Sequence, residues 1–115
     1  MTNKEDIEQF LQDFKTKMDF WDIVFMDNRS KNTQTLADLE ITPIKRKAII
    51  KELVLENYSE GPIEDVVFMG SPMWVFGKEV KSKEIYIKIS MGFAGRQTLC
   101  ISFHVSEYPM QYPFN

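Results

Sequence analysis

The stretch EIYIKISM, residues 84–91, decides the fold class, because isoleucine alternates along it with tyrosine, lysine and serine. Such alternation is typical of a strand with one buried and one wetter face. The stretches MWVFGKEV (73–80) and TLCISFHVS (98–106) have a similar strand-like composition. A polar turn at 81–83 and a glycine-containing loop at 92–95 separate the three stretches. The pattern predicts an antiparallel meander.

The residues before Gly61 follow a helical period instead. Apolar side chains at helical spacing predict an amphipathic helix over roughly residues 4–18. Thr42 followed by Pro43 predicts the start of another helix, running to about residue 53, because threonine caps a first turn in which proline needs no N–H.

Shorter elements fill the remaining chain. Residues 20–26 read as a short strand followed by a turn, and residues 33–39 as a short helix. The two prolines within residues 108–114 exclude a central strand, so we expect this segment to run extended over the surface or along an edge. The whole predicts a single α+β domain over residues 1–115, with N-terminal helices packed on an antiparallel sheet.

Composition limits the class of protein. The chain has 115 residues and a formal net charge of −3, and the acidic excess lies in the first 60 residues. The single cysteine, Cys100, excludes an internal disulfide and a cysteine zinc site. With no membrane segment or secretory signal in the sequence, we expect a cytoplasmic protein with no membrane partner. We also expect no cofactor or metal, since the side-chain acid–base chemistry described below needs none. The acidity weighs against a nucleic-acid binder, whose affinity comes mostly from neutralised phosphates.

Strand parity brings four polar side chains to the wetter face of the predicted sheet. Tyr86 and Lys88 lie on one strand, and Ser102 and His104 on the next. If the loop at 92–95 centres the hairpin, Tyr86 is opposite Ser102, and His104 is its diagonal neighbour at roughly 7–8 Å. The other parity, Leu99 to Val105 in steps of two, is expected to face the helices.

These side chains suit the cleavage of RNA by its own 2′-hydroxyl. His104, the only histidine, can take or give a proton near neutral pH. Tyr86 could act as the acid or as a hydrogen-bond donor to the phosphate, and Lys88 could stabilise the charged phosphorane. The alternative is a lone surface histidine on a solvated strand face, which is the commoner situation for this residue.

Three short runs carry a resemblance to a known family. The runs MWVF (73–76), EIYIKI (84–89) and CISFH (100–104) resemble the C-terminal half of MqsR-type toxins. These toxins are messenger-RNA interferases of bacterial type II toxin–antitoxin systems with a RelE-like microbial ribonuclease fold. The segment 36–59 is similar to the family's middle region, so the likeness spans roughly residues 33–106.

The resemblance implies roles for particular residues. Tyr86 occupies the position of the family's catalytic tyrosine, and His104 that of a catalytic lysine after Ser-Phe. Histidine suits proton transfer near neutral pH better than lysine does. Val75 stands where the family has a glutamine, and Ser59 where it has a lysine.

The resemblance also implies ligands and partners. Phosphate binding would then fall to Lys88, Lys78 or Arg96. Trp74 could stack on an RNA base, with core packing as the more usual alternative. The expected partners are messenger RNA and a cognate antitoxin protein. Recruitment to a ribosome would compensate for a low intrinsic affinity for RNA.

The sequence is also compatible with other functions. The acidic helical half could bind a basic partner, as in a non-catalytic interaction domain such as an immunity protein or adaptor. A degenerate toxin that only binds its antitoxin would fit the departures at Val75 and Ser59. The basic run Lys45–Lys47 could contact RNA or an acidic partner, or form a solvated helix face.

Overall fold

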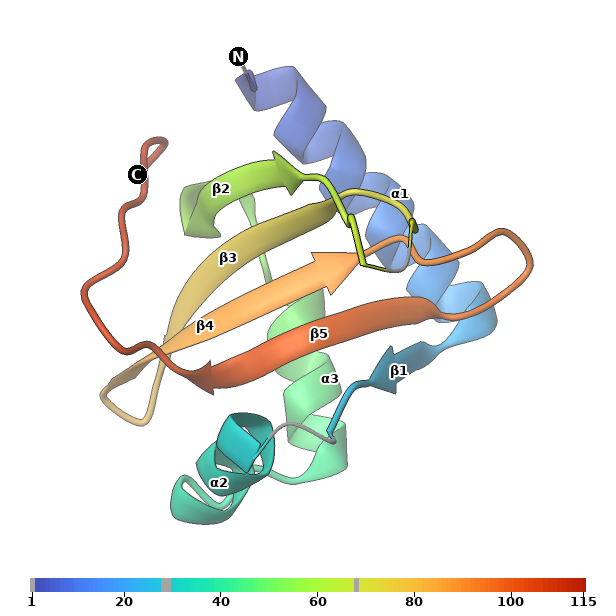
Figure 1. Cartoon of the computed structure of the whole chain (residues 1–115). Helices are drawn as coiled ribbons and strands as arrows, with labels where there is room; N and C mark the ends of the chain where they lie inside the picture. Colours follow the sequence, from blue (N-terminus) through green and yellow to red (C-terminus); the bar gives the residue numbers. More distant parts are fainter. Residues whose placement is uncertain (1, 28–29, 68) are drawn as a thin grey trace.

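The computed structural model describes residues 2–27, 30–67 and 69–115 of the chain (Figure 1). The elements, in chain order, are α1 (Lys4–Trp21), β1 (Ile23–Phe25), α2 (Ser30–Asp38), α3 (Pro43–Lys51), the short 3₁₀ helix η1 (Leu55–Asn57), β2 (Tyr58–Ile63), β3 (Met73–Val80), β4 (Lys83–Ser90) and β5 (Thr98–Val105).

The five strands form one sheet in the order β1-β5-β4-β3-β2. The predicted α+β class is confirmed, and the three predicted strands are β3, β4 and β5. The sheet is mixed rather than purely antiparallel, because β1 runs parallel to β5 while the other pairs are antiparallel. The sequence analysis did not predict β2, which pairs with β3 through an irregular register.

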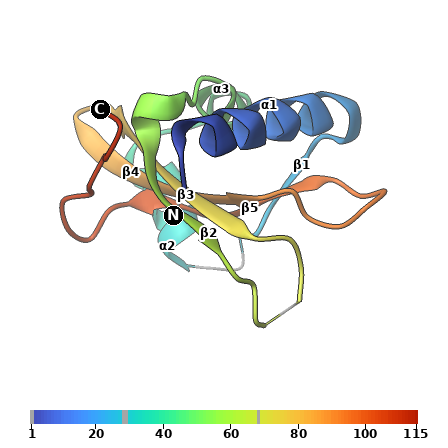
Figure 2. The ribbon, with the colours of Figure 1, turned by 90° about the horizontal axis from the view of Figure 1, so that it is seen from above.

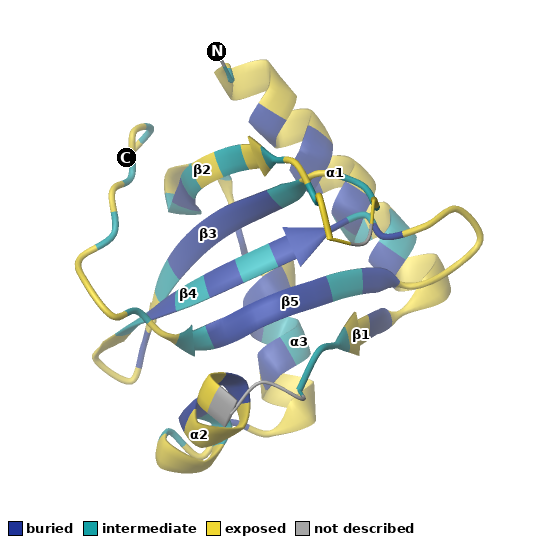
Figure 3. Cartoon of the chain, in the orientation of Figure 1, coloured by how far each residue is buried: buried dark blue, intermediate teal, exposed yellow. Residues whose placement is uncertain are grey.

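The main core lies between the sheet and the helices α1 and α3, which cover the same face (Figure 2). Ile85, Ile87 and Ile89 of β4 are fully buried there, as their spacing predicts. The apolar stripe of α1 packs above them through Ile7, Phe10, Leu11, Phe14 and Met18. Figure 3 shows the resulting alternation of buried and partly buried positions along β4.

The first helix ends later than predicted, whereas the start of α3 is as predicted. The first helix continues to Trp21, so that only residues 23–25 remain extended. In α3, Thr42 caps the first turn by accepting from the Lys45 N–H at 3.1 Å, as expected. Ile44, in the first turn of α3, is 82% exposed and does not contribute to the core.

A β-bulge reverses the predicted parity in part of β5. The register pairs Lys88 with Ser102 but Ile89 with Cys100, so one extra residue, Ile101, is inserted into β5. Such an insertion turns the following side chains to the other face. Cys100 therefore packs in the same core cluster as Phe103, although their parities differ.

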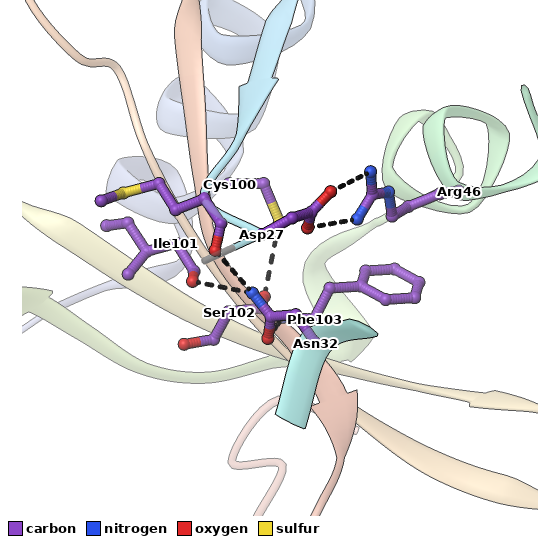
Figure 4. A network of polar contacts seen from close by, with 8 residues as sticks. Asp27, Asn32, Arg46, Cys100, Ile101, Ser102 and Phe103 are labelled. Atoms are coloured by element: carbon purple, nitrogen blue, oxygen red, sulfur yellow. Dashed lines mark hydrogen bonds and ion pairs between the residues drawn. The ribbon is translucent and has the colours of Figure 1, made fainter. Parts of the chain in front are cut away.

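The helix α2 closes the open edge of β5. The strand β1 pairs with residues 98–100, and among the described residues no strand pairs with residues 101–105 on this side. The Asn32 Oδ1 accepts from the Phe103 N–H at 3.0 Å, and its Nδ2 donates to the Ile101 carbonyl at 3.3 Å (Figure 4). One turn later, the Thr35 Oγ1 accepts from the Val105 N–H at 3.0 Å.

We expect Asn32→Ala to lower the free energy of unfolding by about 2 kcal/mol, because it leaves a buried Phe103 N–H without an acceptor. Chemical denaturation followed by circular dichroism measures the change. Gln34→Ala, an exposed position of the same helix, is the control and should change stability by no more than about 0.5 kcal/mol. Equal effects of the two substitutions would contradict the role assigned to Asn32.

Candidate functional site

Tyr86 and His104 form a stacked pair on the face of the sheet opposite α1. The two residues lie directly across from each other on β4 and β5. Their ring centroids are 5.2 Å apart, and the ring planes are inclined by only 11°. The shared face was predicted correctly, but the expected diagonal register was wrong by two positions. The bulge at Ile101 accounts for one of them, and a loop running over residues 91–97 for the other.

The imidazole of His104 is oriented by the backbone of its own strand. Its Nδ1 lies 3.0 Å from the Val105 carbonyl oxygen. A carbonyl oxygen only accepts, so in this contact Nδ1 carries the proton and donates it. The lone pair of the neutral ring is then on Nε2, which is the atom able to take a proton from a ligand.

Lys88 shares this face with the ring pair. It lies two residues from Tyr86 on β4 and directly across from Ser102, which is 1% exposed. In β3 its partner is Val75, which is fully buried. An apolar, buried Val75 offers no hydrogen bond to a ligand at that position.

The structure does not bring the other predicted ligand-binding residues to this pair. Trp74 is stacked on Phe10 of α1, with ring centroids 4.6 Å apart, and belongs to the main core. Lys78 is in register with the buried Ile85, on the parity opposite to Tyr86. Arg96 is in the loop at the other end of β5, roughly 20 Å along the strand from His104.

Two hollows flank the stacked rings. His104 lines one of about 390 Å³, between β5 and α2, together with Lys31, Gln34 and Asp38. Lys31 there is paired with Glu107. Tyr86 lines the other, of about 360 Å³, which the C-terminal segment 106–115 closes on one side. A ligand that bridges the hollows would pass over both rings.

Glu84 fixes the C-terminal segment to the sheet. Its Oε1 accepts from the Met110 N–H at 3.0 Å, and its Oε2 accepts from the Tyr112 hydroxyl at 2.6 Å. Desolvation and the bond to Glu84 raise the pKa of Tyr112 well above its ordinary value. The segment was expected to run over the surface or along an edge, and it does so with specific anchors that its sequence does not reveal.

Two of the three residues in the basic run 45–47 form ion pairs within the protein. Arg46 is 5% exposed and holds Asp27 through two bonds of 2.8 and 2.9 Å (Figure 4). Its guanidinium carbon also lies 3.4 Å from the centroid of the Phe25 ring. Arg46 is therefore not available to RNA or a partner. Lys47 bonds Asp22, and this bond lowers the pKa of the Asp22 carboxyl.

The thiol of Cys100 is not activated as a nucleophile. Burial raises the pKa of the Cys100 thiol to about 12, so the thiol stays protonated at neutral pH. Among the described residues, no cluster of three or more histidine, cysteine and acidic side chains is arranged to hold a metal ion. Within the same residues, no helix combines the length and apolar character needed to cross a membrane.

No family model, curated protein or solved structure matches this chain. Sequence reasoning missed Glu84, Gly77 and the residues of the C-terminal segment. The glycine within an otherwise strand-like run could have signalled a close approach of another segment.

We expect Asp27→Ala to lower the free energy of unfolding by about 2–4 kcal/mol, because it leaves the Arg46 guanidinium buried without its carboxylate. The control is Asp19→Ala, which removes an exposed ion pair with Lys51 and should cost at most about 1 kcal/mol. Denaturant titration of both variants measures the difference. If both substitutions lower the free energy of unfolding by the same small amount, the ion pair between Arg46 and Asp27 does not stabilise the fold.

We expect the anchorage of the C-terminal segment to weaken as the pH rises above about 10. A pKa raised on folding means that the Tyr112 contribution is complete below the ordinary value of about 10 and is lost as the pH rises beyond it. Hydrogen exchange of residues 107–115 between pH 9 and 11 would report the release. Tyr112→Phe should already exchange faster at pH 9 and lack the alkaline step, whereas an unchanged profile would contradict the anchor.

Proposed function

We propose that this protein is an endoribonuclease that cleaves messenger RNA by side-chain acid–base catalysis, as the toxin of a type II toxin–antitoxin system. The observation that supports the proposal is the stacking of Tyr86 on His104 at 5.2 Å, directly across two hydrogen-bonded strands. A proton acceptor and a proton donor thus lie within the span of one phosphodiester. The resemblance to MqsR-type toxins supplies the substrate class and the biological context of the proposal.

The reaction needs two proton transfers. His104 Nε2 removes the proton of a 2′-hydroxyl, whose oxygen attacks the adjacent phosphorus and forms a new O2′–P bond. The P–O5′ bond breaks, and the Tyr86 hydroxyl gives its proton to the leaving 5′-oxygen. The products are a 2′,3′-cyclic phosphate and a 5′-hydroxyl. Transfer of the imidazolium proton to solvent and uptake of a proton by the phenolate restore the enzyme.

Lys88 is the cation placed to stabilise the charge that develops on the phosphate. It shares the face and the strand of Tyr86 and is partly exposed. Preorganised cations contribute strongly to catalysis where charge accumulates in the transition state. In this proposal Trp74, Lys78 and Arg96 have no part in the chemical step.

The remaining features of the proposal follow from the toxin assignment. Acting on messenger RNA requires a cytoplasmic location, and a growth-arresting nuclease requires a cognate antitoxin protein. The net charge of −3 makes free RNA a weak ligand, so ribosome-bound messenger RNA is the favoured substrate.

We expect His104→Ala and Tyr86→Phe each to lower the rate of RNA cleavage by roughly 100- to 10,000-fold, the range typical of a lost acid or base. The assay follows a fluorescent RNA whose products are tested for a 2′,3′-cyclic phosphate, and a single 2′-deoxy nucleotide at the cleaved position should block the reaction. Lys83→Ala, at an exposed position of β4, is the control.

The unfolding temperatures of His104→Ala and Tyr86→Phe should lie within a few degrees of the wild-type value, since both side chains are only partly buried. In cells, the wild type should arrest growth and the product of the adjacent gene should restore it. If His104→Ala remains fully toxic, histidine is not the base.

The second candidate is a non-catalytic interaction domain, and the charge distribution of α1 favours it. Lys15 and Lys17 of this helix turn onto backbone carbonyls of Leu53 and Met91, at 2.5 Å each. The exposed positions of the helix include the acidic residues Glu5, Asp6, Glu8, Asp13 and Asp19. Such a face suits a basic partner. This candidate predicts no RNA cleavage at any protein concentration and no effect of His104→Ala. A degenerate toxin would be harmless but bind its antitoxin tightly.

A further inference from the structure

The hollow beside Tyr86 is built by two segments that are far apart in the sequence. Ser59 and Glu60 of β2 form one side of it, and residues 106–111 form the other. Figure 1 shows the C-terminal segment leaving β5 and turning back beside β3 and β2. The ring of Phe114 reaches Tyr58, with centroids 5.8 Å apart, and so ties the segment to β2.

The segment is held in this position by a close approach to β3. A Cβ atom on Gly77 would overlap the Tyr112 hydroxyl and lie 2.8 Å from the Met110 sulfur, so the segment needs a glycine there. Gly77 is in register with Tyr86. Tyr86, the proposed acid, therefore lies directly across from Gly77, the residue against which the C-terminal segment packs.

The chemistry of the hollow suits a planar, polar-edged ligand better than a phosphate. In the part of the chain that the structure describes, no lysine or arginine lines the hollow, whereas the carboxylate of Glu60 does. Tyr108 is 75% exposed and offers a flat apolar surface, and Gln111 is exposed at the same rim. Aromatic faces bind nucleobases by stacking, and amide and carboxylate groups bind the exocyclic amines of adenine, guanine and cytosine.

We propose that this hollow is a nucleobase subsite, in which Tyr108 stacks on a base next to the scissile phosphate and Gln111 and Glu60 contact its edge. The inference deepens the proposed ribonuclease function and rests on it for the position of the phosphate. Because Glu60 accepts hydrogen bonds, the subsite prefers a base with an exocyclic amino group over uracil. The C-terminal segment is thus part of the substrate-binding surface.

Binding to a short oligonucleotide that cannot be cleaved tests the subsite. The probes are fully 2′-deoxy tetranucleotides of adenine, cytosine or uracil, titrated into the full chain and followed by NMR amide shifts. We expect the adenine and cytosine probes to shift Tyr108, Gln111 and Glu60 and to bind at least several-fold more tightly than the uracil probe. Tyr108→Ala should weaken binding by roughly 5- to 100-fold.

Two further variants separate the subsite from the fold. Gln12→Ala, at an exposed position of α1 that lines neither hollow, should leave probe binding unchanged. Gly77→Ala should displace the C-terminal segment and weaken binding as much as Tyr108→Ala does. If Gly77→Ala prevents folding, Gln111→Ala, at an exposed position, gives the same test.

The outcomes distinguish this inference from the proposed function. Probe shifts at Tyr108 and Gln111 in a protein that never cleaves RNA would support the subsite and overturn the nuclease. If the wild type cleaves RNA, and Tyr108→Ala and Gln111→Ala each bind the probes and cleave RNA as well as it does, the subsite is overturned and the nuclease is not. Equal binding of all three probes would overturn the role of Glu60.

Discussion

The pairing of β4 with β5 is the constraint on which the rest of the structure depends. A shift of one residue in this register would turn every side chain of β5 to the opposite face. The inserted residue, Ile101, lets Cys100 and Phe103 both pack in the core while His104 lies across from Tyr86. The same bulge therefore sets the packing of β5 in the core and the position of the ring pair at the candidate site.

The open edge of β5 explains the position of α2. The three residues of β1 cannot pair with the whole of β5, so unpaired backbone groups remain where the strand continues. Side chains of Asn32 and Thr35 supply the missing bonds, one helical turn apart. The helix that satisfies the edge also forms one wall of the hollow beside His104. Backbone hydrogen bonding and the shape of the candidate site are thus linked through one short helix.

Much of the positive charge is used within the protein. Arg46 is buried against Asp27, Lys47 and Lys51 pair with aspartates, and two lysines of α1 bind backbone carbonyls. Basic side chains that are held in internal contacts are not available to neutralise phosphates. Such a protein therefore gains little affinity for RNA from counterion release. Recognition of RNA, under the proposed function, would depend on stacking and on contacts to base edges, which an acidic surface permits. The C-terminal segment offers both kinds of group.

The sequence by itself determined the α+β class, the start of α1 and α3, the three central strands and the shared face of Tyr86, Lys88 and His104, because these follow from local periodicity and capping. It also singled out the only histidine as the candidate base. Only the tertiary structure decided the register of His104, the parallel strand β1, the burial of Trp74 and Arg46, and the anchoring of the C-terminal segment on Glu84. Each of these depends on contacts between residues that are distant in the chain, such as Tyr112 with Glu84 or Arg46 with Asp27. Local sequence patterns do not indicate such partners, because tertiary packing determines where a β-bulge, an unpaired strand edge or a buried ion pair forms.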